Sequence, residues 1–307
     1  MKRSILYIFF CYFLNLSLFG QTKKMCITVD DLPVVSYGIE DTNYLKEVTT
    51  GLIHTANENN VPLIGYVNEG TLHTNSGVDT FKVALLRYWI ENGHDLGNHT
   101  YSHIDYNNVP VEIYTEDIIK GEKITRALLK QHNKHLMYFR HPYLHTGSTR
   151  TLSDNLHRKL DSLGYIESPV TIDNSDYIFA QMYHEAFVKK NIEKMNYIGK
   201  EYITYMERKL VHFENVSNTL YGRYAGQTLI IHANLLNAHY LHALIGMYKK
   251  HGYVFVSQTE IIKDQVYKQP IQWYSKQGIS WLYKWSPQEQ FPMLEKGDPE
   301  DPIVTEK

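Results

Sequence analysis

The sequence predicts an α/β protein built on a parallel sheet, and two observations lead to this prediction. From residue 24 onwards, short apolar runs alternate with longer amphipathic runs, which is the pattern of parallel strands joined by crossover helices. Clusters of polar, chemically reactive side chains directly follow five of the apolar runs. Neither an internal repeat nor a low-complexity linker interrupts the alternation, so one large domain is the simplest organisation.

Seven short apolar runs are predicted to form the strands of this sheet. Most are rich in aliphatic residues and too short for a buried helix. The predicted strands lie at 25–29, 61–67, 94–97, 136–139, 169–172, 228–231 and 253–257.

The amphipathic segments between the strands are predicted to form helices. Asp41 or Thr42 can cap the first helix, Pro110 precedes the third, and Gly164 follows the fourth. The helices are expected at 42–60, 78–92, 111–131, 149–163 and 235–251, and a short helix follows the last strand. Residues 178–224 have helical character without a clear strand, and we interpret them as a helical insertion.

Residues 1–20 have the features of a cleaved secretory signal peptide. Lys2 and Arg3 precede an apolar run at 5–18, and a small residue follows that run. The run is too short to favour a membrane span, although an uncleaved anchor is the alternative. Beyond residue 20 the chain has one cysteine, Cys26, which cannot form an internal disulfide. We therefore expect an exported, periplasmic or secreted protein without a stable membrane span after cleavage.

Charge and composition bear on the class of partner. The formal net charge is −2 and no basic stripe occurs, so we expect no nucleic-acid partner. The chain has 25 Tyr and 4 Trp residues, which suit a sugar-binding cleft but equally suit an ordinary core. The same two interpretations apply to Trp273, Trp281 and Trp285 in the C-terminal tail: they stack on sugars, or they cover the barrel.

The polar clusters are predicted to meet in one site. They are Asp30-Asp31, His99, Arg140, Asp173 and His232, and each lies just past a predicted strand. In a parallel barrel the carboxyl ends of the strands open on one face, where active sites are built.

Two histidines suggest that this site binds a metal. His99 and His103 would share a face if the chain turns helically there. In a chain with 16 histidines this spacing is expected by chance roughly once, and a second pair exists at His141 and His145. A set of two His and one Asp suits zinc or a similar divalent ion. Thr100 disfavours a zincin, whose motif requires Glu at that position.

The two adjacent aspartates would have two different roles in a metal hydrolase. One of Asp30 and Asp31 would bind the metal, and the other would take a proton from water. Each cluster also has a plain structural interpretation when it is considered alone. Asp30-Asp31 suits a turn or a helix cap, Arg140 a surface loop, Asp173 an Asx turn, and His232 a buried core histidine. The order and placement of the five clusters together favour an active site.

The chain resembles the polysaccharide deacetylases of carbohydrate esterase family 4 over about residues 24–258, apart from the insertion. The motifs that carry the resemblance are TVDDLP at 28–33, HTYSH at 99–103, RHPY at 140–143, DNSDY at 173–177 and LIIH at 229–232. The resemblance implies an irregular parallel (β/α) barrel of about seven strands, with the helical insertion before the last strands. We accordingly divide the chain into a signal peptide at 1–20, a barrel domain at 21–266 with the insertion at about 178–224, and a C-terminal tail at 267–307.

The resemblance also implies a metal site and a base. Asp31, His99 and His103 would hold a divalent ion, zinc in the first place, with cobalt or nickel as alternatives. Asp30 would be the general base, and Arg140 would orient it.

The remaining roles concern the leaving group and the substrate. The resemblance implies that His232 is the general acid and that Asp173 pairs with it and tunes its pKa. The backbone N–H of Tyr143 would help to bind the oxyanion, and Ile230 and Tyr177 would form the wall of the acetyl pocket.

The expected activity is removal of N-acetyl groups from an amino-sugar polysaccharide or oligosaccharide, with release of acetate. Three positions differ from the usual family pattern: Leu32 and Leu144 replace Gly, and Tyr177 replaces Trp. These differences alter the walls of the cleft and leave the proposed ligands, base and acid in place. The alternatives are a non-catalytic glycan-binding protein on the same fold and a deacylase of a small N-acyl or O-acetyl compound. Peptidase activity is less favoured.

Overall fold

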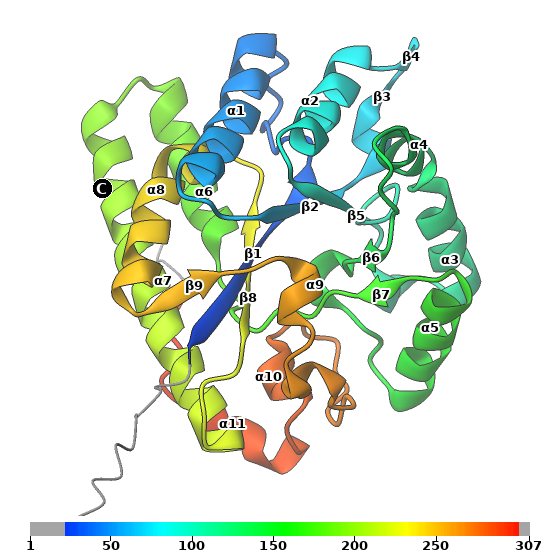
Figure 1. The fold of residues 1–307 in the computed structure, drawn as a ribbon, viewed down its shortest axis with the longest axis vertical. Helices are drawn as coiled ribbons and strands as arrows, with labels where there is room; N and C mark the ends of the chain where they lie inside the picture. Colours follow the sequence, from blue (N-terminus) through cyan, green and yellow to red (C-terminus); the bar gives the residue numbers. More distant parts are fainter. Residues whose placement is uncertain (1–21, 301–307) are drawn as a thin grey trace, which may run out of the picture.

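A curled parallel sheet surrounded by helices forms the centre of the computed structural model, which describes residues 22–300 (Figure 1). The predicted signal peptide and residues 301–307 lie outside this described part. Within it, the main sheet has seven strands, and a separate two-stranded hairpin is formed by β3 (His73–Thr74) and β4 (Gly77–Val78). The sheet curls into a half-barrel, which confirms the predicted α/β class and the irregular parallel barrel.

The central strand of the sheet is β1. The strand order is β7-β6-β5-β2-β1-β8, and β8 pairs with β1 along one side, while β2 and β9 share the other side. The strands are β1 (Lys23–Leu32), β2 (Leu63–Val67), β5 (Asp95–Asn98), β6 (Tyr138–Phe139), β7 (Ile166–Glu167), β8 (Gln227–His232) and β9 (Tyr253–Phe255).

The predicted strand at 169–172 is wrong in its position. A two-residue strand, β7, forms just before it, and Ile172 makes only an isolated parallel bridge to Leu229 of β8. The proline at residue 169 has no N–H to donate to a strand ladder, which explains the interruption. At the start of this stretch, the N–H of Ser168 donates to the carbonyl oxygen of Phe139 in β6, at 2.9 Å. Residues 168–172 therefore connect β6, near one edge of the sheet, to β8 at the other edge.

Four helices match their predicted ranges to within a few residues. They are α1 (Thr42–Glu58), α2 (Thr80–Glu91), α5 (Arg150–Ser162) and α8 (Leu235–Lys250). Each has a capping side chain that accepts hydrogen bonds from N–H groups of the first turn, supplied by Asp41, Asp79, Thr149 and Asn234 respectively. The short helix expected after the last strand is α9 (Gln258–Ile261).

The single long helix predicted at 111–131 is wrong. The structure has two helices, α3 (Val111–Lys120) and α4 (Lys123–Gln131), with Gly121 between them. A Cβ at Gly121 would lie 2.5 Å from the carbonyl carbon of Thr100 and 2.5 Å from the nitrogen of Tyr101. The chain breaks here because the backbone after β5 packs directly on this glycine.

Residues 178–224 are helical, as predicted. They contribute to α6 (Asp176–Val188) and α7 (Ile192–Tyr221), which lie with α8 on one side of the sheet, opposite α3, α4 and α5 (Figure 1). The inner face of α7 carries buried aromatic side chains, including Tyr202, Tyr205 and Phe213. No helix of the described residues has both the length and the hydropathy of a membrane span.

The C-terminal segment, defined here as residues 267–300, packs on the barrel. It contains α10 (Trp281–Lys284) and α11 (Phe291–Leu294) (Figure 1), and the N–H of Trp281 donates to the carbonyl oxygen of Val170 at 2.7 Å. Trp273, Trp281 and Trp285 are 8%, 3% and 4% exposed. Their burial supports the interpretation of these rings as apolar cover rather than as a sugar platform. Short 3-10 helices complete the fold: η1 (Glu69–Leu72), η2 (Tyr106–Asn108), η3 (Pro142–Leu144), η4 (Gln265–Lys268) and η5 (Gln288–Gln290).

Candidate active site

Both aspartates at the end of β1 reach the same site because the strand is irregular there. In a regular strand, neighbouring side chains point to opposite faces. The pairing of β1 with β2 shifts register between Val29 and Leu32, and Asp31 has a φ of 62°. As a result, Asp30 Oδ2 lies 3.7 Å and Asp31 Oδ1 lies 3.5 Å from His99 Nε2.

The loop after β5 holds His99 and His103 without a helical turn. Thr100 and His103 have positive φ values of 66° and 54°, so the chain does not make the helical turn that would place the two histidines on one helix face. The Asp117 carboxylate accepts hydrogen bonds from the N–H groups of Tyr101 at 3.0 Å and Ser102 at 2.9 Å, which holds the loop in this shape. The two imidazoles nevertheless lie close together, with ring centroids 4.9 Å apart.

Asp31, His99 and His103 form a group whose geometry suits one metal ion. One ligand atom from each lies within 4.8 Å of the other two. Asp31 Oδ1 is 3.5 Å from His99 Nε2 and 3.6 Å from His103 Nε2. Ligands in a tetrahedron at about 2.1 Å from zinc lie about 3.4 Å apart. Asp31 Oδ1 is also buried and has no hydrogen-bond partner among the described residues, as a metal ligand atom would.

The surroundings of the histidines prepare them as ligands. His99 Nδ1 lies 2.8 Å from the carbonyl oxygen of Arg140, so this nitrogen carries the hydrogen and Nε2 is the free ligand atom. Burial lowers the pKa of both His99 and His103. Both imidazoles are therefore neutral near pH 7, which is the form that binds metals.

Asp30 is a buried carboxylate beside this group. It is 1% exposed, and Arg140, which is fully buried, places its Nε 3.9 Å from Asp30 Oδ2. The Arg140 guanidinium also donates to Thr28 Oγ1 at 2.9 Å and lies over the Tyr66 ring, which fixes its position. Burial raises the pKa of Asp30 to about 6, although the positive charges of Arg140 and His232 oppose the rise. Asp30 is thus mainly ionised at pH 7.

The predicted partner of His232 is wrong, because Asp176 rather than Asp173 pairs with it. His232 Nδ1 lies 2.7 Å from Asp176 Oδ1, and the backbone N–H of His232 donates to Asp176 Oδ2 at 2.9 Å. Asn237 also donates to Asp176 Oδ2, at 2.7 Å. Asp176 begins α6, so its side chain points back to β8, while Asp173 lies in the cavity wall near Lys209.

The Asp176 carboxylate decides the charge of His232. Burial alone would lower the pKa of His232, but the charge and hydrogen bond of Asp176, with smaller contributions from Asp31 and Asp30, raise it to about 10. His232 is therefore protonated near pH 7. By contrast, burial raises the pKa of the Asp173 carboxyl to about 6, although the positive charge of Lys209 opposes this rise.

One cavity of about 700 Å³ joins these groups. Nine of the ten predicted site residues line it, and Arg140 lies buried behind Asp30. The nine are Asp30, Asp31, His99, His103, Tyr143, Asp173, Tyr177, Ile230 and His232. Tyr143 and Tyr177 are each 53% exposed, whereas Ile230 is buried. The cavity thus has an open aromatic rim and a small apolar patch near the reactive groups.

The second histidine pair does not form a metal site. His141 Nε2 lies 2.5 Å from Glu167 Oε1, and His145 Nδ1 lies 2.7 Å from Asp105 Oδ1. The two histidines therefore contact separate carboxylates around the cavity.

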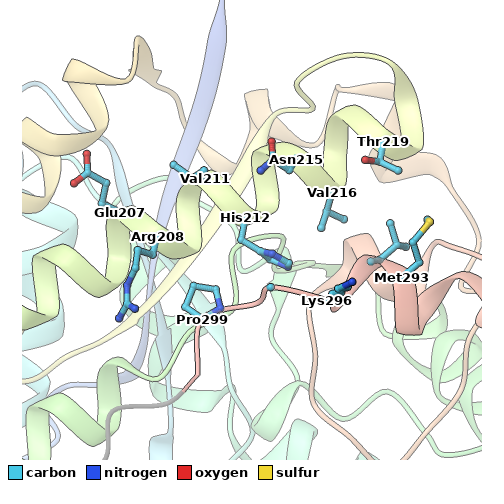
Figure 2. Close-up of a pocket in the computed structure, with 12 residues that line it drawn as sticks. Glu207, Arg208, Val211, His212, Asn215, Val216, Thr219, Met293, Lys296 and Pro299 are labelled. Carbon is cyan, nitrogen blue, oxygen red and sulfur yellow. The ribbon is translucent and has the colours of Figure 1, made fainter.

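A second cavity, of about 730 Å³, lies between α7 and the C-terminal segment. Figure 2 shows His212 reaching from α7 toward the segment that carries Lys296 and Pro299. None of the ten predicted site residues lines this cavity. The predicted site residues thus lie on the first cavity or, for Arg140, directly behind it.

Four residues of the site were not predicted as functional: Asp176, Asn237, Tyr37 and Lys209. Asp176 lies within the fourth motif, but only the packing of the start of α6 against β8 selects it over Asp173. Tyr37 and Lys209 line the cavity but come from a loop and from the middle of α7. Neither residue directly follows a predicted strand, so the sequence pattern did not identify them.

Comparison with known sequences finds a matching family profile for the N-terminal half of the chain. The sequence profile of the polysaccharide deacetylases matches residues 20–165, slightly less than half of the chain. The match includes the first three motifs. No curated protein matches the chain in sequence.

Solved structures of this family share the fold. A polysaccharide deacetylase from Bacillus cereus has 18% sequence identity and a TM-score of 0.52, and the alignment covers 76% of this chain and 91% of that protein. A mutant, with restored enzymatic activity, of a CE4 family pseudoenzyme from Bacillus anthracis has 14% identity and a TM-score of 0.50, with 79% and 68% coverage. At these identities the similarity shows the fold alone.

The metal assignment predicts different effects for two histidine-to-alanine changes. His103→Ala should weaken zinc binding by about 100-fold or more, because it removes a ligand. His145→Ala, the matched control in the second pair, should leave the zinc Kd within about 3-fold of its original value. Calorimetric titration of the metal-free proteins with zinc measures both constants. Equal weakening by the two substitutions would contradict the assignment.

Proposed function

We propose that the protein is a metal-dependent deacetylase that removes N-acetyl groups from an amino-sugar polysaccharide or oligosaccharide and releases acetate. The observation that carries the proposal is the presence, on one cavity, of a three-ligand group, a buried carboxylate and a histidine hydrogen-bonded to a second carboxylate. The match of residues 20–165 to the polysaccharide deacetylase profile supports it. Zinc is the proposed ion, with cobalt or nickel as alternatives, because two imidazoles and a carboxylate suit these ions.

Asp30 acts as the general base in this proposal. A divalent ion held by Asp31, His99 and His103 would supply Lewis acidity toward the acetamide carbonyl and lower the pKa of water. Asp30, ionised at pH 7 and 3.7 Å from His99 Nε2, accepts the proton of the attacking water. Arg140, behind Asp30, holds the carboxylate in place and favours its ionised form.

His232 acts as the general acid. Its protonated imidazole donates to the nitrogen of the leaving amine, so that the amino sugar departs neutral. Asp176 holds the ring by Nδ1, which leaves the Nε2 proton for donation. The backbone N–H of Tyr143 donates to the developing oxyanion. Ile230 and Tyr177 line the pocket for the acetyl methyl and the sugar ring.

In this proposal the protein acts on its substrate outside the cytoplasm. The basic and apolar pattern of residues 1–20 supports export, to the periplasm or beyond. A cavity of about 700 Å³ with exposed Tyr143 and Tyr177 at its rim suits a sugar that enters from one side.

An acetate-release assay tests the proposal. Zinc-, cobalt- or nickel-loaded protein should release acetate from at least one N-acetylated glycan among chitin oligosaccharides, N-acetylgalactosamine polymers and peptidoglycan fragments, and a chelator should stop the release. Glycan binding that persists with chelator present, without acetate release from any of them, would instead indicate a non-catalytic binding protein. Release only from small N-acyl or O-acetyl compounds would change the substrate class.

The base assignment predicts that Asp30→Asn loses activity while it keeps its metal. The amide cannot accept the water proton, so kcat should fall by at least about 100-fold. Zinc affinity should stay within about 10-fold, because Asp31, His99 and His103 remain. A variant with normal kcat would show that another group is the base.

The corrected pairing predicts a shift of the alkaline limb of the pH–activity profile. Asp176 raises the pKa of His232 to about 10, so the acid form persists as the pH rises through 8 and 9. Asp176→Asn removes the negative charge and should move the alkaline limb of kcat/KM to lower pH. Asp173→Asn, the matched control, should leave that limb in place. The opposite pattern would restore Asp173 as the partner.

A further inference from the structure

The C-terminal segment touches the loop that carries the proposed oxyanion donor. This loop, defined here as residues 141–146, includes η3 and forms part of the cavity wall. Gly278 of the segment also lines the cavity. The residues that the family profile matches end at 165, so this contact comes from a part of the chain beyond the match.

The backbone of the loop has an uncommon conformation. Tyr143 and Leu144 have φ values of 55° and 57°, and both are side-chain-bearing residues in the left-handed region. Two such residues in succession persist when the surrounding structure holds them. The direction of the Tyr143 N–H depends on this conformation.

Gly278 provides the first restraint. A Cβ at this position would lie 1.7 Å from the carbonyl oxygen and 2.9 Å from the carbonyl carbon of Tyr143. The φ of Gly278 is not positive, so its conformation is open to other residues. Glycine is therefore required only because the segment lies directly against the Tyr143 peptide group.

Lys284 provides the second restraint. It is 4% exposed, and its Nζ donates to the carbonyl oxygen of Leu144 at 2.6 Å and to Thr146 Oγ1 at 3.2 Å. Nζ also lies 4.3 Å from the centre of the Trp281 ring. These contacts hold the loop at the second of the two left-handed residues and two residues beyond it.

We propose that Gly278 and Lys284 are positioning residues that direct the Tyr143 N–H toward the reacting carbonyl, so that the C-terminal segment is part of the catalytic apparatus. The inference rests on the proposed function, because only an acyl-transfer reaction uses this N–H as an oxyanion donor. The segment acts through the loop rather than through contact with the reacting atoms.

The central experiment compares two glycine-to-alanine variants. Gly278→Ala should lower kcat for acetate release by about 10- to 100-fold. The added methyl group would overlap the carbonyl oxygen of Tyr143, so the loop must shift and the Tyr143 N–H loses its alignment. KM and the zinc Kd should each stay within about 3-fold. Gly246→Ala is the matched control, since nothing lies within 4 Å of a Cβ at Gly246, and it should behave as the wild type. Unchanged kcat in Gly278→Ala would overturn the proposal.

Hydrogen exchange supplies a readout that does not depend on activity. Peptides that span 141–146 should exchange faster in both Gly278→Ala and Lys284→Met than in the wild type and Gly246→Ala, while peptides that span 99–103 keep their rates. Unchanged exchange at 141–146 in both variants would overturn the proposal. If the wild type releases no acetate, the proposed function fails, and the exchange rates still decide whether the segment holds the loop.

Discussion

The parallel pairing of β1 on both of its sides is the constraint on which the site depends. The register with β8 sets Asp30 opposite His232, and the pairing with β2 continues to Leu32 and Val67. Parallel strands end on the same edge of a sheet, so the loops that follow them converge. The bulge between Val29 and Leu32 adds the one irregularity that lets two adjacent aspartates serve the same site. A one-residue slip would turn the wrong side chains toward the cavity.

Two buried carboxylates show how the surroundings divide the chemistry between base and acid. Burial raises the pKa of Asp30, and Arg140 limits the rise, so this carboxylate is a base of moderate strength. Burial acts on Asp176 in the same direction, but its bonds to His232 and Asn237 outweigh burial and lower its pKa. Asp176 therefore stays charged and keeps His232 protonated. Titratable groups whose environments move their pKa values apart are the mark of acid–base assignments.

The sequence was sufficient to predict the sheet, most helices and the gathering of ten site residues, because strand ends and apolar periodicity are local signals. It was insufficient where tertiary contacts decide. The break at Gly121 depends on the backbone of Thr100 packing against it, and the choice of Asp176 over Asp173 depends on how α6 meets β8. The 99–103 loop replaces the expected helical turn because Asp117 binds its N–H groups. The contact of Gly278 with Tyr143 joins segments that no spacing rule connects.

The central claim is that Asp31, His99 and His103 bind one catalytic metal ion at the end of the barrel strands. Anomalous diffraction from crystals of the zinc-loaded protein tests this claim most directly. The account predicts a peak within about 2.0–2.3 Å of one Asp31 carboxylate oxygen and of the Nε2 atoms of His99 and His103. A zinc peak at His141, His145 or another group, with none between these three side chains, would contradict it.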